Sequence, residues 1–140
     1  MKSIISFRLA GNILLFLLVL LSLFHILVLS GLIPDEIVWA GTASQRGKSA
    51  TFTLEFIALA VTLLFLFIIL IKTRYLKSKY LYLATDFLTW IIFAYFLLNA
   101  VANFLSEAKM ETYIFGPLAL ILSFLSFRLA IEKTPVKSAE

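Results

Sequence analysis

An uninterrupted run of 26 residues without a charged side chain, Leu9 to Pro34, constrains this chain more than any other feature of its sequence. An apolar α-helix of about 20 residues is long enough to cross the hydrocarbon core of a bilayer. Lys2 and Arg8 precede the run, as in a signal peptide, but the run exceeds the roughly 7–15 residues of a signal core and no small-residue cleavage site follows. The sequence therefore predicts a retained first transmembrane helix over residues 9–33.

Three further apolar segments follow, and they predict spans over residues 50–71, 82–105 and 112–131. The chain is 62% hydrophobic and only 14% charged, whereas soluble domains carry about 25% charged residues. This composition excludes a soluble enzyme and a disordered protein. We expect an all-α, integral membrane four-helix transmembrane bundle that forms a single domain over residues 1–140.

The second and fourth predicted spans contain only short uncharged stretches. Their uncharged stretches, 56–71 and 112–127, have 16 residues each, which is about 24 Å of helix. We therefore expect Glu55 at or just inside one membrane face. We expect Arg128 in the last turn of its helix, with its side chain reaching the headgroups.

The distribution of Lys and Arg predicts the orientation of the spans. Nine of the 12 lie on the side of the two termini, namely in the N-terminal segment, the loop 72–81 and the last turn and tail of the chain, and three lie on the other side. Such an excess in short loops marks the cytoplasmic side. We expect both termini inside, an exterior loop at 34–49, a cytoplasmic tail at 132–140, and a multi-pass location in the bacterial cytoplasmic membrane.

The basic loop accounts for the net charge of +4 without a nucleic-acid partner. Basic residues beside a membrane interact with anionic headgroups, at about 1 kcal/mol each. We expect membrane lipids as partners and no nucleic acid, with an RNA-binding or regulatory patch as the alternative. The predicted membrane-surface residues are Lys72, Arg74, Lys77 and Lys79.

Several chemistries are excluded by residue counts. The chain has no cysteine and a single histidine, His25, so it offers no disulfide, no thiolate site and no multi-histidine metal centre. No phosphate-binding glycine loop is present. We predict no catalytic residues, no metal and no cofactor.

Polar residues inside predicted spans are the best indication of a functional site. Several such residues fall at one depth near the exterior face, and Asn99 and Asn103 share a helix face with Tyr95. If the helix faces meet, the side chains form one hydrogen-bonded cluster, with Trp39 of the exterior loop above it. The predicted ligand-binding residues are His25, Glu55, Tyr95, Asn99, Asn103 and Trp39.

Each member also has a purely structural interpretation. Glu55 would occupy the first turns of a helix capped by Thr51 or Thr53. His25 would be a neutral core residue, and the asparagines would hydrogen-bond between helices.

On the other side, Asp86 near the start of the third span is expected to lie within reach of Lys79 or the turn at Tyr82.

Three functional hypotheses follow. The first is a non-catalytic membrane module, acting as a homo-oligomer or as an accessory subunit with a membrane-protein partner. The second is binding or transport of a small amphiphile, cation or proton through the exterior polar cluster. The third, an intramembrane enzyme with His25 as base and Glu55 as its orienting carboxylate, lacks a nucleophile with matching partners.

Overall fold

The computed structural model describes residues 4–38, 47–78 and 80–133. These residues form only helices and their connections. The elements are α1 (Phe7–Leu29), α2 (Asp35–Val38), α4 (Lys48–Lys72), α5 (Tyr82–Phe104), a single π-helical segment η1 (Glu111–Phe115) and α6 (Gly116–Ala130).

Four of these helical segments are long and apolar enough to cross a membrane. They are α1, Ser49–Lys72 of α4, α5, and the continuous helix Glu111–Ala130 formed by η1 and α6. The prediction of an all-helical chain with four candidate membrane spans is therefore confirmed.

The first span ends four residues earlier than expected because a glycine terminates it. Gly31 adopts the left-handed backbone, with φ at +78°. Its N–H donates to Val28 O at 3.0 Å, and the N–H of Leu32 donates to Leu27 O at 3.1 Å. These two bonds define a Schellman cap, in which glycine is favoured because it lacks a Cβ. The polypeptide therefore leaves the helix at Ser30, before its apolar run ends.

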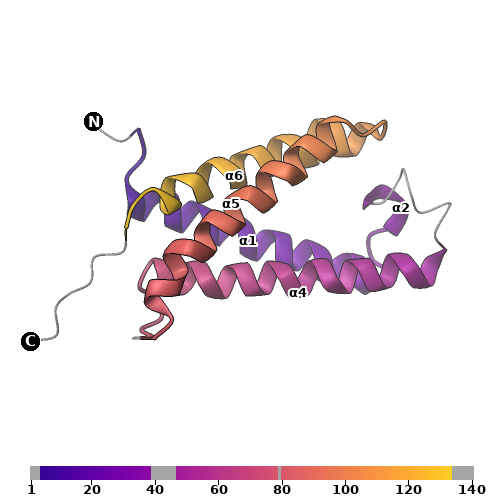
Figure 1. The fold of residues 1–140 in the computed structure, drawn as a ribbon. Helices are drawn as coiled ribbons and strands as arrows, with labels where there is room; N and C mark the ends of the chain where they lie inside the picture. Colours follow the sequence, from indigo (N-terminus) through magenta and orange to yellow (C-terminus); the bar gives the residue numbers. More distant parts are fainter. Residues whose placement is uncertain (1–3, 39–46, 79, 134–140) are drawn as a thin grey trace, which may run out of the picture.

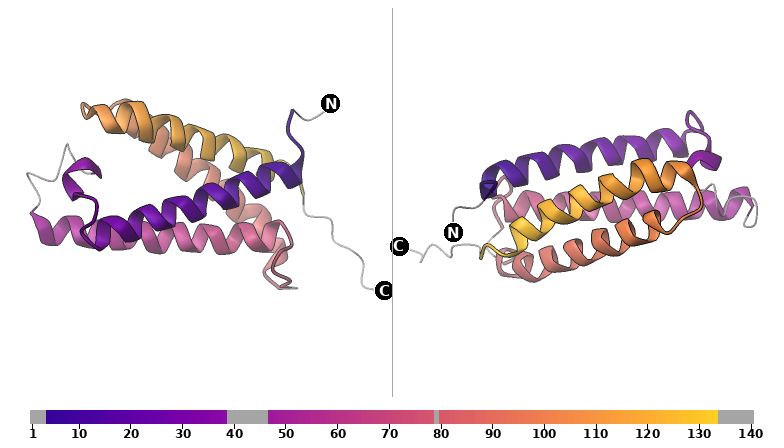
Figure 2. Two further views of the ribbon diagram at one scale, coloured as in Figure 1. Left: turned by 180° about the vertical axis from the view of Figure 1, so that it is seen from behind. Right: turned by 90° about the horizontal axis from the view of Figure 1, so that it is seen from above.

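The four long helices form two antiparallel pairs (Figure 1). Helix α1 packs mainly on α4, and α5 packs mainly on α6; smaller contacts of α1 with α6 and of α4 with α5 join the pairs. Both described chain ends and the α4–α5 turn lie at one end, which we call the terminal end. Helix α2 and the α5–α6 turn lie at the other, which we call the α2 end (Figures 1 and 2).

The two pairs converge at the terminal end and diverge toward α2 (Figures 1 and 2). The core follows this shape and lies in the middle and terminal parts of the helices. Its fully buried members are apolar side chains from all four long helices, including Leu14, Leu18, Ile69, Ile92, Leu122 and Leu129. The outer faces carry exposed apolar residues such as Phe16, Phe56 and Phe87, as expected of helices that contact lipid.

Candidate functional site

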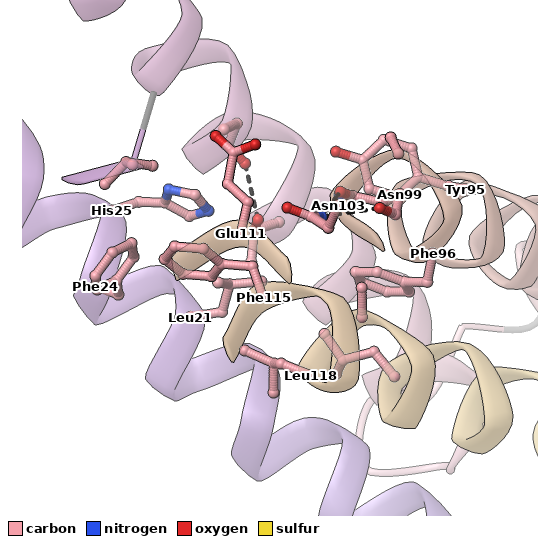
Figure 3. Close-up of a pocket in the computed structure, with 16 residues that line it drawn as sticks. Leu21, Phe24, His25, Tyr95, Phe96, Asn99, Asn103, Glu111, Phe115 and Leu118 are labelled. Carbon is pink, nitrogen blue, oxygen red and sulfur yellow. Dashed lines mark hydrogen bonds between the residues drawn. The ribbon is translucent and has the colours of Figure 1, made fainter. Parts of the chain in front are cut away.

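A cavity of about 290 Å³ occupies the space between the two helix pairs toward the α2 end. Every helical element contributes to its wall, including α2 through Val38. Figure 3 shows the side chains that project into it. The cavity is therefore a consequence of the divergence of the two pairs and does not belong to one helix.

The strongly polar side chains of the cavity wall lie near the α2 end, beside apolar residues such as Phe24 and Phe115, and the wall toward the middle of the bundle is mainly apolar. The polar groups are the side chains of His25, Asn99, Asn103 and Glu111, which we call the polar ring. One to three turns deeper, α1, α5 and α6 contribute the apolar floor, consisting of Leu21, Phe96, Leu118 and Leu122. Thr62 and Tyr95 also line this deeper part, so the floor carries two hydroxyl groups among its apolar residues. A site with this gradient matches a molecule with a polar head and an apolar body.

His25 is held in the polar ring by Glu55. Its Nδ1 hydrogen-bonds to Glu55 Oε1, and the bond joins α1 to α4. Both residues are buried, at 8% and 2% exposed. Because Nδ1 is engaged by Glu55, the other ring nitrogen, Nε2, is the one available to the cavity.

Glu55 itself faces a second, smaller cavity. Its neighbours there include Val28, Pro34 and Thr51. The His25–Glu55 pair thus separates two cavities and does not place both side chains in one. Glu55 acts on the main cavity through His25.

The two asparagines form a rigid amide pair along α5. Asn103 Nδ2 donates to the backbone oxygen of Asn99 at 2.8 Å and to Asn99 Oδ1 at 2.7 Å. Thr112 donates to the backbone oxygen of Asn103 at 3.3 Å and ties α5 to the start of η1. These bonds leave Asn103 Oδ1 as a hydrogen-bond acceptor toward the cavity, within the part of the chain that the structure describes.

Glu111 belongs to the site although the sequence places it in the turn before the fourth span. It is the first residue of η1, and its carboxylate projects into the same space as His25 and Asn103 (Figure 3). The wide π turn ends at Gly116, directly before Pro117. Proline has no N–H and its ring clashes with the carbonyl four residues earlier, so a wider turn at this point relieves a clash.

Aromatic rings close the side of the site between α1 and η1. Phe24 lies edge-on to His25, with ring centroids 6.0 Å apart, and 5.7 Å from the ring of Phe115. These edge-on and tilted contacts pack one flank of the imidazole against aromatic rings. The polar ring therefore faces a largely apolar surrounding, where its hydrogen bonds are stronger than in water.

The charge of the cavity wall is negative or neutral. Glu111 contributes a carboxylate, and His25 is bonded to a second carboxylate. No Lys or Arg is among the described residues that line the cavity. An anionic head would therefore meet repulsion and no cation, whereas a cationic or hydrogen-bond-donating head would meet acceptors.

The structural interpretations of these residues are only partly compatible with the structure. Helix α4 begins at Lys48 after Gly47, with no side-chain cap, so the interpretation in which Thr51 or Thr53 caps the helix and Glu55 occupies its first turns is wrong about the cap. Glu55 instead lies in the third turn. The Asn99–Asn103 bond lies within α5 and does not join two helices. Trp39, predicted to lie above the cluster, is outside the described residues.

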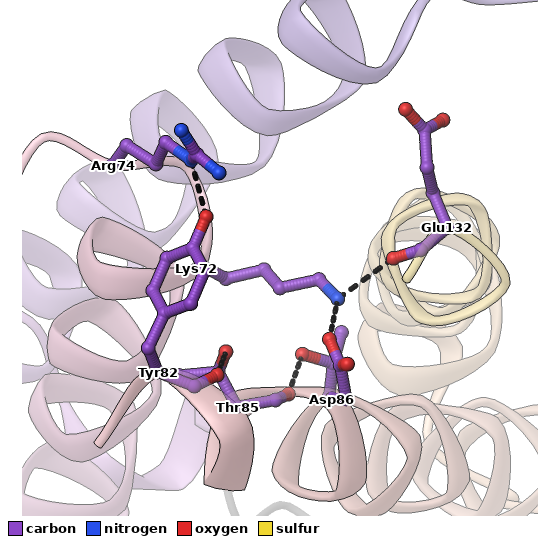
Figure 4. A network of polar contacts seen from close by, with 7 residues as sticks. Lys72, Arg74, Tyr82, Thr85, Asp86 and Glu132 are labelled. Carbon is purple, nitrogen blue, oxygen red and sulfur yellow. Dashed lines mark hydrogen bonds and ion pairs between the residues drawn. The ribbon is translucent and has the colours of Figure 1, made fainter. Parts of the chain in front are cut away.

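A second polar cluster, the terminal network, lies at the opposite end of the bundle (Figure 4). Lys72 Nζ contacts Asp86 Oδ1 at 2.5 Å and donates to Glu132 O at 2.8 Å. The ammonium thus joins the end of α4, the start of α5 and the end of α6. Nearby, Arg74 Nε donates to the hydroxyl of Tyr82.

This network changes the position assigned to one predicted surface residue. Lys72 was expected at the headgroups, yet its side chain is 0% exposed. The Asp86 carboxylate and the carbonyl of Glu132 at the end of α6 take the place of water around its ammonium. Asp86 pairs with Lys72, and the alternative partner Lys79 is outside the described residues. Arg74 and Lys77 are exposed.

Arg128 lies in the last turn of α6, as expected. There Arg128 Nε donates to Ile5 O at 2.8 Å, and its guanidinium pairs with Glu132 at 2.8 Å. Its side chain therefore ties the start of the described chain to α6.

Comparisons with known proteins assign no family to this fold and site. No protein-family model, no curated protein and no solved structure matches the chain. Within the described residues, no three His, Asp or Glu side chains gather where they could hold a metal ion. The geometry of the cavity is therefore the best indication of function.

Proposed function

We propose that this chain binds a small amphiphile in the cavity between the two helix pairs, with the polar head at the polar ring and the apolar body on the floor. The observation that carries the proposal is the gradient of the cavity wall. His25, Asn103 and Glu111 project into the cavity near the α2 end (Figure 3), and the residues deeper in it are mainly apolar, with the hydroxyls of Thr62 and Tyr95 among them. Four helices that served only as a packing module would not need a polar ring in the wall of a cavity.

The chemistry of the ring favours a cationic or hydrogen-bond-donating head. Glu111 and Asn103 Oδ1 present acceptors, and the His25 imidazole is backed by the Glu55 carboxylate. A hydrogen bond between a carboxylate and a charged donor contributes about 1.5–3 kcal/mol. We therefore favour a primary amine, which is protonated at neutral pH, over an acid of the same length.

The size of the cavity limits the occupant to a small molecule. Small-molecule sites usually have volumes of about 300–1,000 Å³, and this cavity, at about 290 Å³, lies at the lower end. A molecule with one short alkyl chain fits such a volume.

We also propose that both termini face the cytoplasm of a bacterial cell, which places the polar ring in the exterior leaflet. The distribution of Lys and Arg, nine against three, supports this orientation. Fusion of a fluorescent protein that folds only in the cytoplasm tests it. A C-terminal fusion should fluoresce, and a dark C-terminal fusion with a fluorescent insertion after residue 43 would reverse the orientation.

The hypothesis of a homo-oligomer or accessory subunit stays a prediction. The exposed apolar faces of the helices would contact lipid or other helices equally well. No specific observation in the structure favours it over the binding function.

Equilibrium binding of octylamine to the full chain in nanodiscs tests the proposed function. We expect saturable binding to the native protein, and binding of octyl sulfate no greater than to empty nanodiscs. Glu111→Gln and Glu55→Gln should each weaken octylamine binding about tenfold, because each removes a charge worth about 1.4 kcal/mol to the bound head.

Glu107→Gln is the matched control. Glu107 lies in the same α5–α6 connection, is exposed, and does not line the cavity. It should leave the affinity within about twofold of the native value, the range of ordinary surface substitutions. Equal losses from Glu107→Gln and Glu111→Gln, or equal binding of the amine and the sulfate, would overturn the proposed function.

A further inference from the structure

A separate cavity of about 280 Å³ lies at the terminal end, where α1 begins, α6 ends and the α4–α5 turn passes. It shares no lining residue with the cavity of the polar ring. Its wall includes Arg8 from α1, Arg74 from the turn and Lys133 after α6. Three distant parts of the sequence thus bring basic side chains to one hollow.

The charge of this hollow is positive. Lys72 also lines it, but Asp86 compensates its charge, so the positive charge comes from Arg8, Arg74 and Lys133, which meet one acidic residue, Glu132. The Glu132 carboxylate is already paired with Arg128 at 2.8 Å. Within the described part of the chain, neither Arg8 nor Lys133 forms an ion pair. Cations held around one hollow in this way attract an anion with several oxygen acceptors.

The backbone at Arg74 adopts a conformation that is unusual for an arginine. Its φ is +67°, in the left-handed region, and its N–H donates to Ile71 O at 3.0 Å. This is the position after a helix where glycine is normally found, because a Cβ is unfavourable there. Residues held in such conformations are concentrated at functional sites, which makes Arg74 a candidate.

The guanidinium of Arg74 is also held in place. It lies 5.1 Å from the centre of the Tyr82 ring, and its Nε donates to the Tyr82 hydroxyl (Figure 4). Tyr82 lines the same hollow. The strained backbone and the ring together orient the arginine at the cavity wall.

We propose that this hollow binds a phosphate group, held by Arg8, Arg74 and Lys133. The phosphate comes from the headgroup of an anionic lipid or from a soluble phosphate ester. The site lies at the end of the membrane spans, where headgroups are located. It is distinct from a diffuse basic surface, because Lys77 of the same turn is exposed and does not line it.

Delipidated full-length protein in a neutral detergent provides the test. Phosphatidylglycerol, diacylglycerol and glycerol 3-phosphate are added separately, and binding is followed by native mass spectrometry and by the melting temperature. Phosphatidylglycerol should bind and raise the melting temperature, and diacylglycerol should do neither. Binding of glycerol 3-phosphate with similar affinity assigns the site to a soluble ester; its failure to bind assigns the site to lipid. If no phosphate compound binds, the proposal is wrong.

Charge-neutral variants distinguish a built site from a diffuse one. Arg8→Gln and Lys133→Gln should each weaken phosphate binding about tenfold, whereas Lys77→Gln should leave it unchanged. All three positions are exposed, so the fold tolerates the changes. If Lys77→Gln weakens binding as much as the other two, the basic surface is diffuse and the proposal fails.

Arg74→Gly separates binding from stability. Glycine relieves the left-handed backbone, so the melting temperature without ligand should stay constant or rise by about 3 °C. Phosphate binding should still fall about tenfold. A variant that binds phosphate normally would show that Arg74 is present only to shape the turn, and would overturn its place in the site.

Discussion

Lys72 at the end of α4 and Asp86 in the second turn of α5 form an ion pair at 2.5 Å, with the lysine completely buried and the aspartate side chain 32% exposed. The same ammonium donates to the carbonyl of Glu132. One charge therefore fixes the ends of three helices, and it does so where the two helix pairs converge (Figures 1 and 4).

Removing one partner of this pair should destabilise the protein strongly. Asp86→Asn leaves a buried ammonium without its counter-charge, and we expect a loss of about 3 kcal/mol in the free energy of unfolding. Chemical denaturation in detergent measures it. The double variant Lys72→Met with Asp86→Leu should recover most of the loss, since an apolar pair replaces the buried charges. A loss below about 0.5 kcal/mol in Asp86→Asn, the range of surface changes, would contradict a buried pair.

Gly11 permits the close approach of α1 to the end of α4. A Cβ at this position would lie 2.5 Å from Thr73 Cγ2. Gly11→Ala should therefore cost about 1–3 kcal/mol through overpacking.

The second variant in this test is Thr73→Ser. It removes Cγ2 and keeps the hydroxyl that donates to Ile69 O at 2.7 Å. Combined with Gly11→Ala, it should restore stability. If Thr73→Ser rescues nothing, the contact between Gly11 and Thr73 is not the cause.

Substitution of Gly31 in the Schellman cap of α1 should change stability through the backbone conformation and not through a steric clash. No heavy atom lies within 4 Å of the Cβ that a substitution would add to Gly31. Gly31→Ala should still destabilise the protein by about 1 kcal/mol because φ is +78°. Gly31→Asn should be milder, since asparagine tolerates this conformation better. Thermal unfolding compares the two variants, and an equal effect of both would exclude the backbone as the cause.

Filling the candidate cavity should separate stability from binding. Ala58 lines the cavity from α4, whereas Ala60 is exposed and lies outside it. Ala58→Leu should abolish octylamine binding while the melting temperature stays constant or rises, as cavity-filling changes often stabilise by about 0.5–2 kcal/mol. Ala60→Leu should change neither. Unaltered binding in Ala58→Leu would place the ligand elsewhere.

Much of the fold is predictable from sequence because lipid imposes a simple rule on length and polarity. The four apolar runs give four helices, and Arg128 lies in the last turn of its helix as expected. The end of α1 was missed because Gly31, inside an uncharged run, stops the helix through its backbone and not through its polarity.

The sequence predicted the depth of the site residues in the membrane, but it did not predict the direction in which their side chains point. Residues at one depth share a level of the membrane, which explains why His25, Asn99 and Asn103 could be grouped beforehand. Which helix faces meet depends on packing, and this places Glu55 behind His25 instead of in the main cavity.

The sequence did not indicate Glu111 as a site residue, because an acidic residue near a turn usually faces water. Pro117, six residues later, was the available signal, since a proline just inside a helix can widen the preceding turn. The pairing of Lys72 with Asp86 joins the two sides of the α4–α5 turn. The periodicity of the sequence does not predict such a contact.

Photoaffinity labelling tests the location of the proposed site most directly. A diazirine-bearing alkylamine is bound to the full chain in nanodiscs, activated by light and mapped by mass spectrometry. We expect the label on the apolar floor, at Leu21, Phe96, Leu118 and Leu122, and its loss when unlabelled octylamine is added in excess. Labelling spread over the exposed residues Phe16, Phe56 and Phe87, with no displacement by octylamine, would contradict a ligand bound between the helix pairs.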